Sequence, residues 1–486
     1  MNIQKSDFER FNDIFKLSAL LQSVCLNGEK VYSGFTNVVG DVWYVFFAVR
    51  PALCSSKKSQ APVQNNLLVK VMESDSYKSW HRLTAGDDLL SVITAITFSE
   101  QLIQWLEQNS TIQQAQQIVN STQSKIDAAS NTLQQLRKKK ISLNATIEEK
   151  RQYHQNKHEQ FEMLTSAQQA RKQAKFEIQL EIERLSKDKL ESMINKSRTN
   201  AKEIKKSVMS LSSPDGKQLA NVPISDQLLL SDQLQSNVKL KRIAELTGRF
   251  KSIAKKKQRQ IEKITMNRKD MTLGQEITRL LPIEQANLLL PNFKKDFLRR
   301  FSEHQTLVFD IKGKDRRGKG PIIICMDESS SMTTLKEQSK AFCLALLSIA
   351  HKQKRDFAII PFASDIGDTL IFSKGRATTD EILSFTEEFL GGGTNFEKPL
   401  LASLNILSRS EFNLADILFV TDGTSFLSSA FIDQFNSIKK QRKFLCTAIV
   451  LTNLFNAVDL ALVNRFCDEV IEVNDLFDAE DVFSIT

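Results

Sequence analysis

The stretch ICMDESSSM, Ile324 to Met332, runs from an apolar segment directly into acidic and hydroxyl side chains. The preceding run PIIICM is typical of a β-strand that is buried on both faces. Polar side chains placed directly after such a strand are costly unless a partner binds them. The stretch therefore predicts a strand that ends at a binding site.

The sequence after Gly320 extends this pattern to a whole sheet. Apolar runs alternate with helical patterns in the order PIIICM, FAIIPFA, TLIFS, DILFVTD, FLCTAIVL and EVIEV. Strands that alternate with helices form right-handed crossovers and a mostly parallel, doubly wound sheet. In such sheets, ligands bind beyond the carboxyl ends of the strands, which is where Asp327 falls. We therefore predict a C-terminal Rossmann-like α/β domain after an all-helical N-terminal part.

Three segments at predicted strand ends carry oxygen ligands: DESSS after the first strand, GGGTN before a helix, and TDG after the strand DILFV. They contribute two carboxylates and three hydroxyls, from Asp327, Ser329, Ser331, Thr394 and Asp422. This set suits a hard cation, and we predict Mg²⁺, with Mn²⁺ or Ca²⁺ as alternatives. An acidic side chain of a partner could complete the shell. Ser331 could instead cap the following helix.

The pattern D-x-S-x-S, a later Thr and the Asp of T-D-G resembles the metal-ion-dependent adhesion site of von Willebrand factor A domains. The resemblance covers residues 320–486, and Ser330 stands where Gly is common. It implies that Ser329, Ser331 and Thr394 are direct or switchable ligands. It also implies that Asp327 and Asp422 act mainly through water.

The region before the domain narrows the resemblance to the ViaA-like proteins. It rests on KRIAELTGRF, EITRLLPIEQANL and FKKDFLRRFSEHQTLVFDIKG, followed by RGKGPIIICMDESSSM. The resemblance implies a non-enzymatic, cytoplasmic protein that binds and stimulates a MoxR-type AAA+ ATPase. Such a pair would remodel client complexes, including respiratory enzymes at the inner membrane.

Four regions are expected along the chain. Residues 1–105 form a poorly defined helical region, residues 106–311 a long-helix region, residues 312–319 a basic linker and residues 320–486 the domain with the metal site. No Pro or Gly occurs from Thr111 to Lys206, which predicts long helices. Apolar residues recur there every seven positions, which predicts a helical hairpin or a local coiled coil: Val119, Ile126, Leu133 and Ala129, Leu136, Leu143.

Charge is divided unevenly between the two halves of the chain. Residues 320–486 carry 14 Lys and Arg against 23 Asp and Glu, a net charge of −9, so the total of +9 leaves +18 on residues 1–319. A basic front half suits nucleic acid, an anionic membrane surface or an acidic protein. The six cysteines form no CxxC pair, and the opening residues lack the apolar core of a signal peptide, which together favour the cytoplasm.

Two other functions stay open beside that of a Mg²⁺-dependent adaptor for an AAA+ ATPase. One is a chelatase-type metal-insertion subunit, although no G-x-x-x-x-G-K-[ST] phosphate loop occurs. The other is a nucleic-acid-associated component of a defence system, although no aromatic residues interleave the basic run RFKSIAKKKQRQIEK.

His154 and His158 have an i, i+4 spacing that could bind zinc, but two surface histidines are the simpler interpretation. The apolar segment VWYVFFAV, Val42 to Val49, is too short to span a membrane and predicts a buried element.

Overall fold

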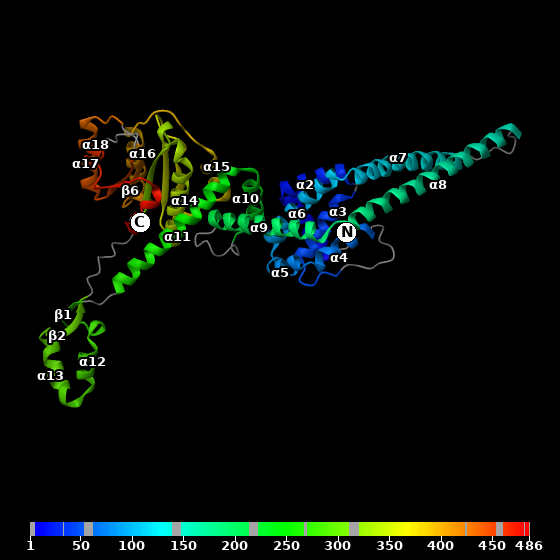
Figure 1. The fold of residues 1–486 in the computed structure, drawn as a ribbon. Helices are drawn as coiled ribbons and strands as arrows, with labels where there is room; N and C mark the ends of the chain where they lie inside the picture. The colour runs from blue at the N-terminus through cyan, green and yellow to red at the C-terminus, as the bar shows by residue number, and fades with distance from the viewer. Residues whose placement is uncertain are drawn as a thin grey trace. The chain divides into compact units, whose positions relative to one another are not determined.

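The computed structural model describes residues 5–32, 34–52, 62–138, 147–212, 222–266, 270–310, 320–422, 425–452, 460–480 and 482–485. The chain forms two compact units, the first from residues 1–208 with 220–236 and the second from residues 209–219 with 237–486 (Figure 1). These units differ from the expected division, because residues 1–105 share a unit with the long helices that follow. The predicted linker 312–319 lies outside the described residues.

The first unit is helical throughout its described part. Its helices are α1 (Lys5–Leu17), α2 (Ala19–Val31), α3 (Phe35–Phe47), α4 (Pro62–Glu73), α5 (Asp75–Thr84), α6 (Asp88–Gln108), α7 (Ser110–Lys138), α8 (Ile147–Glu183), most of α9 (Lys187–Ser212) and α10 (Ile224–Ser236). The prediction that VWYVFFAV is buried is confirmed for residues 42–47, which lie in α3 and are all buried, and it is wrong for Val49, which follows the helix and is 73% exposed. Trp43 stacks on Phe47 with ring centroids 4.7 Å apart, inside the core that α3 shares with α6.

Helix α6 has the length and apolar character of a membrane span, but 72% of its most apolar window is buried within the protein. A helix that is apolar all round and covered by its neighbours is expected at the centre of a helical domain. Residues 88–108 are therefore explained by their place in the core of the first unit.

Helices α7 and α8 form the predicted helical hairpin, which extends as one long arm (Figure 1). The heptad residues Val119 and Ala129 are buried. The hydroxyl of Thr132 donates to Gln160 across the pair at 3.0 Å. The tip, including the heptad residue Leu143, lies outside the described residues.

The second unit contains a six-stranded sheet in the order β5-β4-β3-β6-β7-β8. Its strands are β3 (Ile322–Asp327), β4 (Phe357–Phe362), β5 (Leu370–Phe372), β6 (Asp416–Thr421), β7 (Cys446–Leu451) and β8 (Glu469–Val473). All neighbouring pairs are parallel except β4 with β5, which is antiparallel. The predicted C-terminal fold is thus confirmed, with all six apolar runs forming strands.

Helices cover both faces of this sheet. They are α14 (Lys336–Gln353), α15 (Thr379–Glu387), α16 (Glu397–Leu407), α17 (Ser429–Arg442), α18 (Leu460–Asn464) and α19 (Val482–Ile485). Alternate residues of β3 face opposite sides: Ile323 and Cys325 join the core formed with α16, α17 and α18. Met326 faces the other side, where its sulfur lies 3.3 Å from the thiol of Cys343 in α14. This two-sided burial explains the unbroken apolar run.

Helix α11 (Val238–Met266) packs against α14 of the sheet domain, although the sequence placed it in the helical region. The ring of Phe250 lies 5.6 Å from that of Phe342 and 4.4 Å from that of Phe477. Arg242 forms an ion pair with Glu337 at 3.0 Å. The motif KRIAELTGRF is therefore part of the outer layer of the domain.

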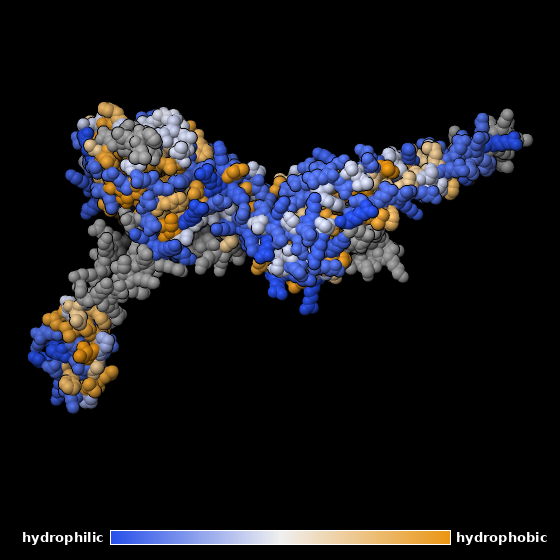
Figure 2. Space-filling model, viewed as in Figure 1, coloured by the Kyte–Doolittle hydropathy of each residue, from blue (hydrophilic) through white to orange (hydrophobic). Residues whose placement is uncertain are grey.

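A small lobe lies between α11 and β3 in the sequence. It contains the antiparallel strands β1 (Asp270–Gly274) and β2 (Thr306–Asp310) with helices α12 (Pro282–Leu289) and α13 (Pro291–Ser302). Its core is Leu280, Phe297 and Val308. The buried carboxylate of Glu284 accepts two bonds from Arg300, at 2.6 and 2.9 Å. Figure 2 shows apolar residues over this lobe, and the exposed ones include Met271, Leu273, Ile277, Ile283, Leu289 and Phe293.

Candidate metal centre

Asp327 ends strand β3 at the carboxyl edge of the sheet and is 1% exposed. One of its oxygens accepts the backbone N–H of Ser329 at 2.8 Å. The other accepts the hydroxyl of Thr421, the last residue of β6, at 2.6 Å. Because β3 and β6 are parallel neighbours, their carboxyl ends meet here. The chain order strand–acid–turn therefore places a carboxylate at the junction of two strands.

The hydroxyls of the serine turn form a chain that leads from Asp327 to Asp422. The hydroxyls of Ser329 and Ser331 lie 3.0 Å apart. Ser331 donates to one oxygen of Asp422 at 2.8 Å. Four of the five predicted residues are thus joined by hydrogen bonds. No helix is capped by Ser331, since helix α14 begins only at Lys336, so the alternative role of this serine is excluded.

Thr394 is brought to the same edge by its backbone. Gly391 N–H donates to the carbonyl of Glu328 at 2.9 Å, and Ser330 N–H donates to the carbonyl of Gly392 at 3.0 Å. Gly391 and Gly392 have φ of 77° and 96°, which glycine adopts without strain. Thr394 is half-buried, and its hydroxyl makes no hydrogen bond within the described part of the chain. The structure thus places the loop that carries Thr394 against the serine turn.

The sequence did not identify two hydroxyl residues that hold this site together. Thr421 donates to Asp327, and Ser425 donates to the carbonyl of Thr394 at 3.1 Å while accepting Phe396 N–H at 3.2 Å. Thr421 could have been noticed, because it belongs to the quoted T-D-G motif. Ser425 carries no local signal, because its partners lie about thirty residues away.

Burial raises the pKa of Asp327, against hydrogen bonds from Ser329 and Thr421, and the charge of Asp422 raises it further. Burial also raises the pKa of Asp422, against the bond from Ser331. The second oxygen of Asp422 is buried and has no hydrogen-bond partner among the described residues. Two carboxylates, one with an unpartnered oxygen, therefore share a buried corner, and neither forms an ion pair with a described residue. The residues present therefore fit a hard divalent cation.

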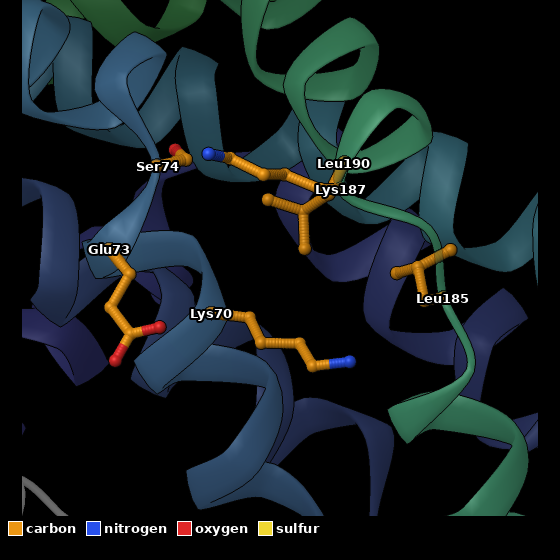
Figure 3. Close-up of a pocket in the computed structure, with 6 residues that line it drawn as sticks. All are labelled: Lys70, Glu73, Ser74, Leu185, Lys187 and Leu190. Carbon is orange, nitrogen blue, oxygen red and sulfur yellow. The ribbon is translucent and has the colours of Figure 1, made fainter.

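Other candidate sites in the described residues are weaker. No group of three or more His, Cys, Asp or Glu there is arranged to hold a metal ion, and His154 and His158 are both exposed on α8. A cavity of about 260 Å³ in the first unit is lined by Lys70, Glu73, Ser74, Leu185, Lys187 and Leu190 (Figure 3). Its buried serine already accepts Tyr77 N–H and donates to the carbonyl of Val71, as the cap of α5.

Residues 322–424 match the von Willebrand factor type A domain. The chain is 31% identical over 258 residues to the uncharacterised protein MJ0811 of Methanocaldococcus jannaschii, covering 52% of this chain and 58% of the relative. It is 34% identical over 227 residues to MJ0077 of the same organism, covering 46% and 57%. The chain thus spans somewhat more than half the length of these relatives.

Among solved structures, the chain is similar to proximal thread matrix protein 1 of the mussel byssus, solved with zinc in its metal-ion-dependent adhesion site motif. The identity is 15%, the TM-score is 0.28, and the match covers 34% of this chain and 46% of that one. The sequence match and the parallel sheet agree on the same part of the chain. This chain therefore contains a von Willebrand factor type A domain, preceded by a helical region.

Proposed function

We propose that the carboxyl edge of the sheet binds a divalent cation, Mg²⁺ in the cell, and uses it to capture a partner protein. The observation that carries the proposal is the buried, unpartnered oxygen of Asp422 beside Asp327, Ser329 and Ser331. With Thr394, these residues would hold the cation. The cation would supply a positive centre for a carboxylate of the partner, because two protein carboxylates leave part of the shell to water or to another ligand.

The proposed role is non-enzymatic. Ser329 shares its hydrogen bond with Ser331, whereas a nucleophilic serine needs a general base within hydrogen-bond reach. His351, the nearest histidine in the sequence, lies in the last turn of α14. The side chains at the site are therefore suited to holding a ligand, and we assign them to binding.

For the partner, we propose a MoxR-type AAA+ ATPase, which this chain would bind and stimulate in a chaperone-like system. The support is the resemblance of residues 237–486 to the ViaA-like proteins. It is strengthened by the packing of α11, with its motif KRIAELTGRF, on α14 of the metal-binding domain. The basic helical region would hold a client complex or an anionic membrane surface. The proposed location is the cytoplasm, including the face of the inner membrane.

A native pull-down tests this function. The tagged full chain is incubated with lysate in Mg²⁺ or in EDTA, and the retained proteins are identified by mass spectrometry. Recovery of an AAA+ ATPase with Mg²⁺ and its loss with EDTA is the expected result. Recovery of nucleic acid whose binding weakens steeply with salt, and no ATPase, would instead favour the defence-system alternative that the +18 front half permits.

Phe426 is expected to contribute to this partner surface. It is 87% exposed and lies between Ser425, which bonds the Thr394 carbonyl, and the buried Leu427. Exposed aromatic side chains beside a binding site are typical anchors, and their truncation costs ~2 kcal/mol or more. Phe426→Ser should therefore weaken Mg²⁺-dependent capture ~30-fold or more, measured by titrating the retained partner.

The matched control for this prediction is Leu414→Ser. Leu414 is 69% exposed and precedes β6 at the opposite end of that strand from the site. This variant should capture the partner as the wild type does, and both variants should bind Mn²⁺ with wild-type affinity. Equal capture by Phe426→Ser and Leu414→Ser would remove Phe426 from the interface.

A further inference from the structure

Lys340 is a lysine buried inside the sheet domain, on the face of α14 that approaches the metal site. It is 1% exposed, and its ammonium group lies 2.7 Å from a carboxylate oxygen of Glu328. The same group donates to the carbonyl of Phe385 and lies 4.3 and 4.8 Å from the ring centroids of Phe385 and Phe389. Burial lowers the pKa of Lys340, and the charge of Glu328 opposes this. Burying a charged pair is costly, so its position needs an explanation.

Glu328 lies between two of the proposed ligand residues, Asp327 and Ser329, and bonds to the end of β4 and to the glycine loop. Its N–H donates to the carbonyl of Phe362 at the end of β4, at 2.7 Å. Its carbonyl accepts Gly391 N–H at 2.9 Å, and its second carboxylate oxygen accepts Leu390 N–H at 3.2 Å. Glu328 therefore joins the serine turn to the glycine loop that carries Thr394.

Lys340 holds the chain at a second point, a few residues before that loop. Phe385 lies in the last turn of α15, from which the chain continues through Phe389 and Leu390 into the glycine loop. The bond from Lys340 to the Phe385 carbonyl and the bond from Leu390 N–H to the Glu328 carboxylate thus hold the segment before Thr394 at two points. The ion pair links these two points to each other.

The ion pair with Lys340 also keeps the carboxylate of Glu328 apart from the carboxylates of Asp327 and Asp422. Asp327 and Asp422 already share a buried corner, in which the Asp422 charge raises the pKa of Asp327. The Glu328 carboxylate points to Lys340 instead, and its charge is balanced there. A neutral residue at position 340 would leave this carboxylate buried without a cation beside the site.

We infer that Glu328 and Lys340 are positioning residues for the metal site. They hold the Leu390–Thr394 segment against the serine turn and thereby set the affinity for a divalent cation. The inference rests on the proposed function, since it concerns the same site. The inference goes beyond the proposed function because it assigns a role in metal affinity to two side chains that are not ligands.

The experiment uses the full chain with Mn²⁺ as the probe and measures its dissociation constant by calorimetry below the unfolding temperature. Lys340→Met should weaken Mn²⁺ binding ~10–100-fold, the range for residues that orient metal ligands. The matched control is Arg355→Met. Arg355 is also a buried cation of the domain, and it donates to the carbonyl of Gly320 before β3, at the other end of that strand. This control should lose stability but keep its Mn²⁺ affinity.

Two further variants separate positioning from general support of the fold. In Glu328→Gln with Lys340→Met, both charges are gone, so the fold should be retained while Mn²⁺ binding stays ~10-fold or more weaker. If the pair acts through the Thr394 loop, adding Lys340→Met to Thr394→Ala should weaken binding much less than the two single effects combined.

The outcomes distinguish this inference from the proposed function. Wild-type Mn²⁺ affinity in Lys340→Met or in the neutral double variant would overturn the inference alone. A fully additive combination with Thr394→Ala would overturn the route through the loop. A wild-type protein that binds no Mn²⁺ would overturn the proposed function, and this inference with it.

Discussion

Asp327→Ala should abolish binding of divalent cations and, with it, metal-dependent capture of the partner. Asp327 supplies one of two carboxylates and orders the serine turn through Ser329 N–H. Residues that merely orient ligands change affinity ~10–100-fold, so loss of this carboxylate should exceed ~100-fold. The fold should persist, because the substitution also removes a buried charge that faces Asp422.

The measurements are Mn²⁺ calorimetry and the pull-down in Mg²⁺. The control is Asp365→Asn, since Asp365 is an exposed acid after β4 that pairs with Lys398 at 3.0 Å. The control should bind metal and partner as the wild type does. Capture by Asp327→Ala that equals the wild type in Mg²⁺ would contradict the metal-bridged mechanism, even if an ATPase is the partner.

The sheet could be predicted from the sequence because its strands are buried on both faces. Ile322 to Met326 are all buried, so no polar residue interrupts the run. The direction of β5 could not be predicted, because three residues between loops carry no sign of pairing direction. The packing of α11 on α14 could not be predicted from the sequence either. Phe250 reads as one apolar position of a basic helix, and its contacts with Phe342 and Phe477 arise only in the fold.

The ligand residues could be predicted from the sequence because each lies in a short motif directly after a strand or before a helix. The structure brings four of them into one hydrogen-bonded group and places Thr394 beside them. The residues that support the ligands could not be predicted from the sequence. Lys340 occurs in the helix as an ordinary charged residue, and only the fold shows that it is buried against Glu328. Long-range pairing of this kind leaves no local pattern.

A cluster of phenylalanine rings connects the stability of the domain to the metal site. Phe419 of β6 is fully buried, with its ring centroid 5.2 Å from Phe362, 5.0 Å from Phe396 and 5.7 Å from Phe466. Three of these rings stand next to the site segments. Phe362 ends β4 and accepts Glu328 N–H, Phe396 follows Thr394 by two residues, and Phe419 precedes Asp422 by three.

Phe419→Ala should therefore lower both stability and metal affinity. Removal of a buried phenylalanine costs ~3–5 kcal/mol, which lowers the melting temperature of a domain of this size by on the order of 10 °C. The cavity would lie beside the rings of Phe362 and Phe396, which adjoin the site segments, so Mn²⁺ affinity of the folded variant should fall as well. Calorimetry of unfolding and of Mn²⁺ binding measures the two effects.

Phe435→Ala separates the two effects. Phe435 of α17 is equally buried, and its ring packs on Phe444 and Phe466, neither of which is next to a predicted ligand in the sequence. It should lose similar stability, ~3–5 kcal/mol, with Mn²⁺ affinity unchanged. Equal metal affinity in both variants would mean that the rings stabilise the fold without shaping the site. A loss confined to Phe419→Ala would mean that the core beneath the sheet edge holds the ligands in place, because of the two cavities only that one lies beside the rings of Phe362 and Phe396.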